Sequence, residues 1–110
     1  MPARKIVLTR EAVYDITDLS EYVEICFGRE TADRFAKEIK EQIQTIGQFP
    51  EGFEKTQINY RNYRIHKKAF PPSVIFYIVQ KNKIHILRVI RQERDWEKIL
   101  KDQNLYSYPE

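Results

Sequence analysis

The chain of 110 residues has a single cysteine, Cys26, with only three glycines and five prolines. One cysteine excludes an intramolecular disulfide and a zinc site built from several cysteines, and it suits a reducing compartment. So little glycine and proline excludes long linkers, collagen-like repeats and low-complexity segments. No apolar run reaches the roughly 18–20 residues that cross a membrane, and no secretory signal follows the N-terminus. These absences predict a cytoplasmic protein with one domain over residues 1–110, of which residues 100–110 form a loose tail.

Acidic and basic residues are distributed unevenly along the chain. Residues 1–57 hold 8 Lys and Arg against 11 Asp and Glu, whereas residues 58–110 hold 11 against 5. Between Ile58 and Arg94, nine basic residues accompany a single acid, Glu93. Such clustering raises the local positive potential and favours an anionic partner, either nucleic acid or an acidic protein segment. A solvated face of an ordinary basic protein is the alternative, because charge alone identifies no partner.

Hydrophobic periodicity predicts a short strand followed by two helices. The segment from Lys5 to Thr9 is β-branched and apolar, and Thr9 is a suitable helix N-cap. Apolar residues then recur at helical spacing in two stripes, which Gly28 separates. The first stripe is Ala12, Ile16, Leu19, Val23 and Cys26, and the second is Ala32, Phe35, Ala36, Ile39, Ile43 and Ile46. They predict an αα-hairpin whose stripes, Cys26 included, pack in the core.

The second half of the chain predicts three strands and a terminal helix. The strands span Tyr60 to Lys68, Val74 to Val79 and Lys83 to Ile90, and Asp95 caps a helix with Trp96, Ile99 and Leu100. We therefore expect an α+β fold: an N-terminal strand at a sheet edge, the αα-hairpin, a three-stranded antiparallel meander and a short C-terminal helix. Both hairpin helices pack on one face of the sheet, and the opposite face stays open and carries Arg64, His66 and Lys68.

The segment SVIFYIVQKNKIHILRVIRQERDW, from Ser73 to Trp96, resembles the RelE/ParE superfamily of bacterial toxins from type II toxin–antitoxin pairs. The runs Ile75 to Tyr77 and Ile86 to Val89, with the Arg94-Asp95 step, are most similar to the ParE branch. The resemblance implies a small sheet with an N-terminal helical hairpin, neutralised by an antitoxin that wraps around it. It also implies one of two activities: ParE-like members inhibit DNA gyrase, whereas RelE-like members cleave messenger RNA on the ribosome.

A ribonuclease site requires cations around the scissile phosphate and a group that carries the proton. The resemblance offers His66 as the proton carrier, with a surface histidine of no special role as the other interpretation, and the candidate cations are Arg64, Lys68, Arg91 and Arg94. The chain departs from RelE-like sites at Ser73-Val74, where an arginine is expected, and at Trp96, which replaces a terminal Tyr. Two histidines without placed carboxylates make no metal site, so we expect neither metal nor cofactor.

These observations favour a ParE-like toxin that acts by binding rather than by bond cleavage. A ribosome-dependent endoribonuclease and a non-toxic binding module on the same fold are the alternatives. The residues expected to bind the target or the antitoxin are Arg61, Arg64, Lys68, Phe70, Arg91, Arg94 and Trp96. The expected partners are a cognate antitoxin with an acidic or amphipathic C-terminal segment, and either gyrase or the ribosome with its messenger RNA. No membrane is involved, and a homodimer and a toxin–antitoxin hetero-oligomer both stay open.

Overall fold

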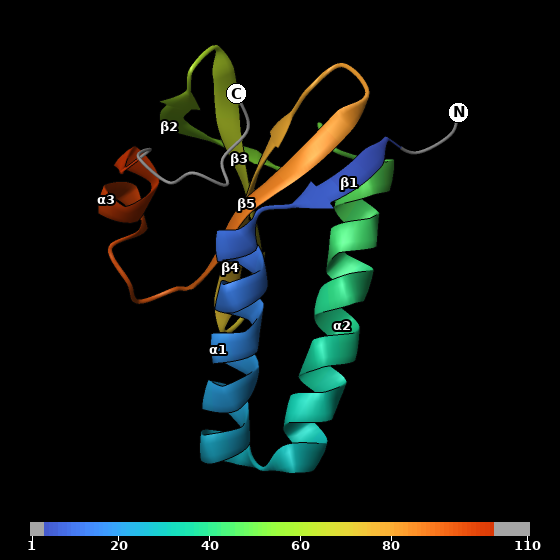
Figure 1. Ribbon diagram of the computed structural model, residues 1–110, viewed down its shortest axis with the longest axis vertical. Helices are drawn as coiled ribbons and strands as arrows, with labels where there is room; N and C mark the ends of the chain where they lie inside the picture. Colours follow the sequence, from blue (N-terminus) through green and yellow to red (C-terminus); the bar gives the residue numbers. More distant parts are fainter. Residues whose placement is uncertain (1–3, 103–110) are drawn as a thin grey trace.

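The structure is a computed structural model that describes residues 4–102. A short strand, two long helices and a run of strands follow one another, and a short helix ends the described chain (Figure 1). The bounds are β1 Lys5–Leu8, α1 Arg10–Phe27, α2 Arg29–Gln48, β2 Glu54–Tyr60, β3 Tyr63–Phe70, β4 Ser73–Val79, β5 Lys83–Arg91 and α3 Trp96–Lys101. In the described range no helix has the length and apolarity needed to cross a bilayer.

The strands form one sheet in the order β1-β5-β4-β3-β2, with β1 parallel to β5 and the other neighbours antiparallel. This arrangement confirms the α+β class, the order of the expected elements and the edge position of β1. The meander has four strands rather than three, because the chain reverses at Arg61, whose φ of 54° is left-handed. The added strand is β2, in which Thr56, Ile58 and Tyr60 alternate inward while their neighbours are exposed.

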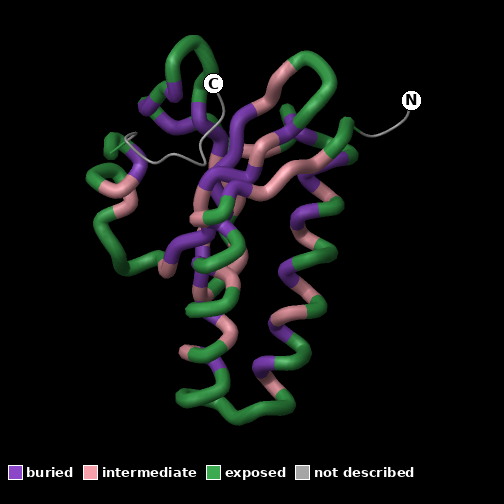
Figure 2. The backbone as a smooth tube through the Cα atoms, viewed as in Figure 1, coloured by how far each residue is buried: buried purple, intermediate pink, exposed green. Residues whose placement is uncertain are grey.

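The αα-hairpin begins at Thr9, as the sequence predicts. The Thr9 hydroxyl accepts a hydrogen bond from the Ala12 amide at 3.1 Å and donates one to the Leu87 carbonyl at 2.7 Å. The same group therefore caps α1 and fixes its start to β5. Gly28, with a φ of 94°, makes the turn into α2. Cys26 is exposed, not buried in the core as expected, because the hairpin extends beyond the sheet at this end (Figures 1 and 2).

The hairpin covers one face of the sheet, as expected. Apolar residues of both helices pack on inward residues of the central strands, and the fully or nearly fully buried members include Leu19, Val23, Phe35, Ile39, Ile46, Ile75, Tyr77, Ile84, Ile86 and Val89. Burying these side chains supplies most of the stability of this layer, at about 25 cal/mol for each Å² of apolar surface removed from water.

The opposite face of the sheet is covered, which corrects the expectation of an open face. A second core lies there, and its buried members are Ile58, Tyr60, Ile65, Phe76, Ile78, Leu87, Ile90 and Leu100. Helix α3 closes this core with Leu100, which is completely buried, and with Trp96, whose ring lies 5.3 Å from that of Phe76. Leu100 and Lys101 thus belong to a helix rather than to a tail, and the rest of the expected tail, residues 103–110, lies outside the described residues.

Candidate functional site

The junction between α1 and β5 holds a buried ion pair. Arg88 donates hydrogen bonds from Nε and Nη2 to the two carboxylate oxygens of Asp15, at 2.7 and 2.9 Å. The Val89 amide donates a third, to Asp15 Oδ2 at 3.0 Å. The two side chains are only 10% and 15% exposed. Two parallel hydrogen bonds from the guanidinium and a third from a backbone amide hold the carboxylate in one orientation and neutralise its charge. The pair therefore helps to set how the hairpin lies on the sheet. Arg88 is therefore a structural arginine that pairs with an acid of α1.

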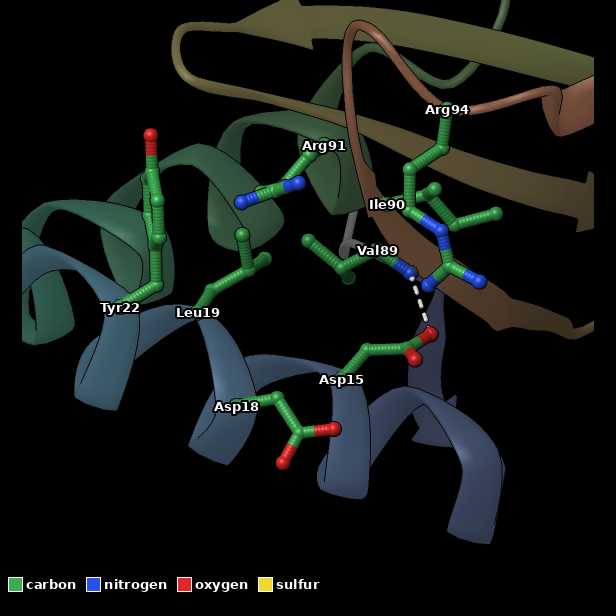
Figure 3. A pocket seen from close by; sticks show the side chains of 8 residues that line it. All are labelled: Asp15, Asp18, Leu19, Tyr22, Val89, Ile90, Arg91 and Arg94. Carbon is green, nitrogen blue, oxygen red and sulfur yellow. Dashed lines mark hydrogen bonds between the residues drawn. The ribbon is translucent and has the colours of Figure 1, made fainter.

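A pocket of about 270 Å³ opens beside this ion pair, at the end of β5. Its lining residues are Asp15, Asp18, Leu19, Tyr22, Val89, Ile90, Arg91 and Arg94. Figure 3 shows both guanidinium groups turned into the pocket, Arg91 toward Tyr22 and Arg94 toward Asp15. The Arg91 guanidinium lies 4.5 Å from the Tyr22 ring centroid, and its Nε lies 2.9 Å from Glu93 Oε1. The pocket therefore presents two arginines next to acids and an aromatic ring, which suits a polar segment of a partner protein.

The structure separates the predicted basic residues into two groups. Phe70 pairs with Ser73 and Ser73 with Arg91, which places Phe70 and Arg91 at the same end of the sheet. Arg64 lies six residues before Phe70 on β3, about 20 Å away along the strand. Its Nη1 donates to the Thr56 carbonyl at 3.1 Å, and Arg61 occupies the neighbouring turn. Arg64 and Arg91 thus do not meet on one surface.

His66 is buried, with 4% of its surface exposed, whereas the sequence predicted that it faces solvent. Its ring stacks on Tyr77 with a centroid distance of 5.0 Å, on the hairpin side of the sheet, and its Nδ1 has no hydrogen-bond partner. Burial lowers the pKa of His66, and nearby Lys55 lowers it further while Glu51 opposes the shift. Burial also raises the pKa of Tyr77, whose hydroxyl donates to the Pro50 carbonyl at 2.6 Å.

Three other predicted residues pack against aromatic rings. The Lys68 ammonium lies 4.9 Å from the Phe53 ring centroid on the hairpin side of the sheet. Phe70 stacks on Phe35 of α2 at 5.8 Å, so it joins the hairpin to β3. Trp96 lies on the opposite face, where the Lys67 ammonium is 5.1 Å from its ring centroid. Lys68 and Trp96 therefore lie on different sides of the sheet.

An apolar groove of about 430 Å³ lies beside the helical hairpin and the edge strand β1, where the sequence offers the antitoxin a groove and a free sheet edge. Side chains of β1 and of both hairpin helices line it: Ile6, Leu8, Ile16, Ala36, Ile39, Lys40, Ile43 and Gln44. Among residues 4–102, no three His, Cys, Asp or Glu side chains gather in a way that would hold a metal ion.

The comparisons with known proteins agree with this architecture. Residues 6–96 match the protein family described as "ParE toxin of type II toxin-antitoxin system, parDE". A solved structure described as "Chromosomal ParDE TA system from P. aeruginosa" aligns with a TM-score of 0.68 at 22% sequence identity, covering 83% of this chain and 98% of that one. Among curated protein sequences none matches this chain significantly.

The fold is therefore that of the RelE/ParE superfamily, in which a helical hairpin packs on an antiparallel meander. Within that class, the match over residues 6–96 assigns the chain to one branch. The protein belongs to the ParE toxin family of type II toxin–antitoxin systems.

Proposed function

We propose that this protein is a growth-inhibiting toxin that acts by binding DNA gyrase and is neutralised by a cognate antitoxin. The family assignment supports a toxin, and the geometry of the basic residues favours binding over RNA cleavage. The observation that carries this preference is the roughly 20 Å that separates Arg64 from the Phe70–Arg91 end of the sheet. Cations that stabilise one scissile phosphate must lie within a few ångströms of it.

The position of His66 supports the same preference. A general base has to lie within about 2.6–3.2 Å of the proton that it abstracts, or reach it through one water. His66 is 96% buried beneath the hairpin side of the sheet, and it lies next to Tyr77 rather than next to a basic pocket. Ser73 occupies the start of β4, where RelE-like sites have an arginine, and it is buried too. We therefore assign Arg91 and Arg94 to protein contacts rather than to phosphate chemistry.

The antitoxin site that we propose is the apolar groove beside β1. Strand β1 is at the edge of the sheet, so a partner strand has backbone groups with which to pair. The side chains of Ile6 and Leu8 line the groove next to that edge. An amphipathic antitoxin segment that pairs with β1 would bury its apolar side chains there and leave its polar side chains at the rim, beside Lys40 and Gln44.

The test is a supercoiling assay with purified gyrase, relaxed plasmid and ATP. We expect the protein to inhibit supercoiling at micromolar concentration, and we expect pre-incubation with its antitoxin to restore it. Arg64→Ala serves as the discriminating variant, because a binding toxin that does not use Arg64 for chemistry keeps its inhibition. Unchanged supercoiling at micromolar toxin, or codon-positioned cuts in messenger RNA that Arg64→Ala abolishes, would favour the ribonuclease. Harmless overexpression would favour the non-toxic binding module.

A further inference from the structure

The outer face of α1, the side of this helix turned away from the core, carries apolar side chains in water. Exposed large hydrophobic residues in the described part of the chain are few, and four of the six lie on α1. They are Val13 at 48%, Tyr14 at 61%, Ile25 at 85% and Phe27 at 63% exposed. Val13 and Phe27 point to other sides of the helix, so only Tyr14 and Ile25 can belong to one exposed face.

Helical geometry places two of these residues on one line with acids between them. Tyr14 and Ile25 are eleven residues apart, about three turns and 16 Å along the helix, so they point in nearly the same direction. Asp18 and Glu21 lie between them on the same side, and Glu24 lies on its flank. All three carboxylates are exposed, as is most of the hairpin far from the sheet (Figure 2). We call the surface of Tyr14, Asp18, Glu21, Glu24 and Ile25 the outer α1 face.

The neighbouring helix shows that this composition is not a general property of the hairpin. Helix α1 has five acids and one basic residue, whereas α2 has four of each sign. None of the exposed large hydrophobic residues in the described chain lies within α2. One exposed surface of α2 carries an ion pair between residues one turn apart, Arg34 and Glu38. The surface of α2 is an ordinary solvated one, and the outer α1 face differs from it in both charge and apolarity.

We propose that the outer α1 face is the docking surface for a basic segment with apolar anchors on the protein target of the toxin, a proposal that rests on the toxin function proposed above. Charge complementarity indicates the partner, because the carboxylates of Asp18, Glu21 and Glu24 repel an acidic segment and attract Lys and Arg. The apolar ends, Tyr14 and Ile25, supply the two anchors of an amphipathic helix or strand.

Two other occupants fit the surface less well. In a symmetric contact between two copies, antiparallel α1 helices would bring Asp18 and Glu21 opposite the same acids of the second copy, which is unfavourable. The antitoxin has its own groove, lined on α1 by Ile16, which points about 140° away from Glu21 around the helix. Because α1 is only about 10 Å across, an antitoxin seated in the groove still obstructs a large target on the other side.

The test compares two charge-reversal variants with the same change of net charge. Glu21→Lys with Glu24→Lys alters the outer α1 face, and Asp33→Lys with Glu41→Lys alters exposed positions of α2. All four positions are exposed, so both variants keep the fold. We expect the α1 variant to lose gyrase affinity by about tenfold or more and to lose growth arrest, while the α2 variant keeps both. Affinity for the antitoxin should stay unchanged in both.

A second pair of variants tests the apolar anchors. Ile25→Ser removes an anchor from the outer α1 face, and Phe49→Ser removes another exposed apolar side chain, 62% exposed, just after the end of α2. We expect growth arrest to weaken with Ile25→Ser and to persist with Phe49→Ser, at matched protein levels.

Four outcomes decide between the possibilities. Growth arrest and gyrase affinity that survive in the α1 variant would overturn the proposal. A loss of antitoxin affinity instead would assign the face to the antitoxin and overturn it as well. A wild-type dimer that only the α1 variant dissociates would assign the face to a second copy, again against the proposal. If wild-type protein does not bind gyrase yet the α1 variant alone loses growth arrest, the gyrase assignment fails and the docking surface stands.

Discussion

At the scale of single residues, the Asp15–Arg88 pair shows how one contact joins distant parts of the chain. Seventy-three positions separate the two residues, and a carboxylate that accepts three hydrogen bonds holds α1 against β5. Removing Asp15 takes from a largely buried guanidinium the carboxylate that accepts two of its hydrogen bonds, and such a loss costs more than the intact pair contributes. Asp15 also lines the pocket that contains Arg91 and Arg94.

We expect Asp15→Ala to lower the free energy of unfolding by about 3–5 kcal/mol, because Arg88 would remain in a nearly dry site without its carboxylate. Urea denaturation of the purified protein measures this change. Asp18→Ala removes an exposed carboxylate one turn away on the same helix, and we expect it to change stability by no more than about 0.5 kcal/mol. Equal losses in the two variants would show that the ion pair has no special role.

His66 makes stability depend on pH in a defined direction. Its pKa in the folded protein is lower than the ordinary value of 6.5, so the unfolded chain takes up the proton first as pH falls. The contribution of neutral His66 to the free energy of unfolding is therefore fully present above pH 6.5, and it is lost as the pH falls below that value. His66→Phe keeps a ring on Tyr77 and removes the titration, so its thermal midpoint should depend less on pH between 6.5 and 5.

His85 provides the comparison for that experiment. Burial and Lys83 lower the pKa of His85 too, so His85→Gln should remove a separate share of the pH dependence. If His66→Phe leaves the pH profile of the wild-type protein unchanged, titration of His66 is not responsible for it.

At the scale of elements, α3 is the small part that closes the second core. Leu100 is completely buried against strands of the sheet, and Trp96 lies beside Phe76. We expect Leu100→Ala to cost about 2–5 kcal/mol and to shift the emission of Trp96, the single tryptophan, toward the red as α3 loosens. Lys101→Ala, at an exposed position of the same helix, is the control. Unchanged Trp96 emission in Leu100→Ala would mean that this side chain does not hold α3 in place.

Local rules predicted the hairpin well because its signals are local. The hydroxyl of Thr9, the glycine at position 28 and two apolar stripes specify the helices and their turn without reference to distant residues. Strand β2 was missed because its turn uses Arg61 and Asn62, and an arginine at positive φ carries no sequence signal. The alternation of Thr56, Ile58 and Tyr60 is visible in the sequence, but without a recognisable turn after it this short pattern does not specify a separate strand.

The candidate site was predicted less well, because it depends on which face of the sheet each strand presents. The alternation of Arg64, His66 and Lys68 correctly groups them on one side of β3, yet nothing local says that the hairpin lies on that same side. Terminal helix α3 was expected, but its docking on the other face required the second core, which only the tertiary structure reveals.

At the scale of the whole molecule, the groove beside β1 and the outer α1 face are the two binding surfaces that we propose, one for the antitoxin and one for the target. We expect Ala36→Glu, which places a charge in the apolar groove, to weaken antitoxin binding by about 10–100-fold. Gln48→Glu adds the same charge at an exposed position of α2 and should leave the affinity unchanged. Titration calorimetry with the purified antitoxin measures both. Equal affinities for the two variants would place the antitoxin elsewhere.

The central claim is that the protein arrests growth by inhibiting gyrase, and the linking number of a reporter plasmid after toxin induction tests it most directly. The account predicts that the plasmid loses negative supercoils as growth stops, while the 5′ ends of messenger RNA from the same cells stay unchanged. Normal plasmid supercoiling together with new codon-positioned messenger ends would contradict it.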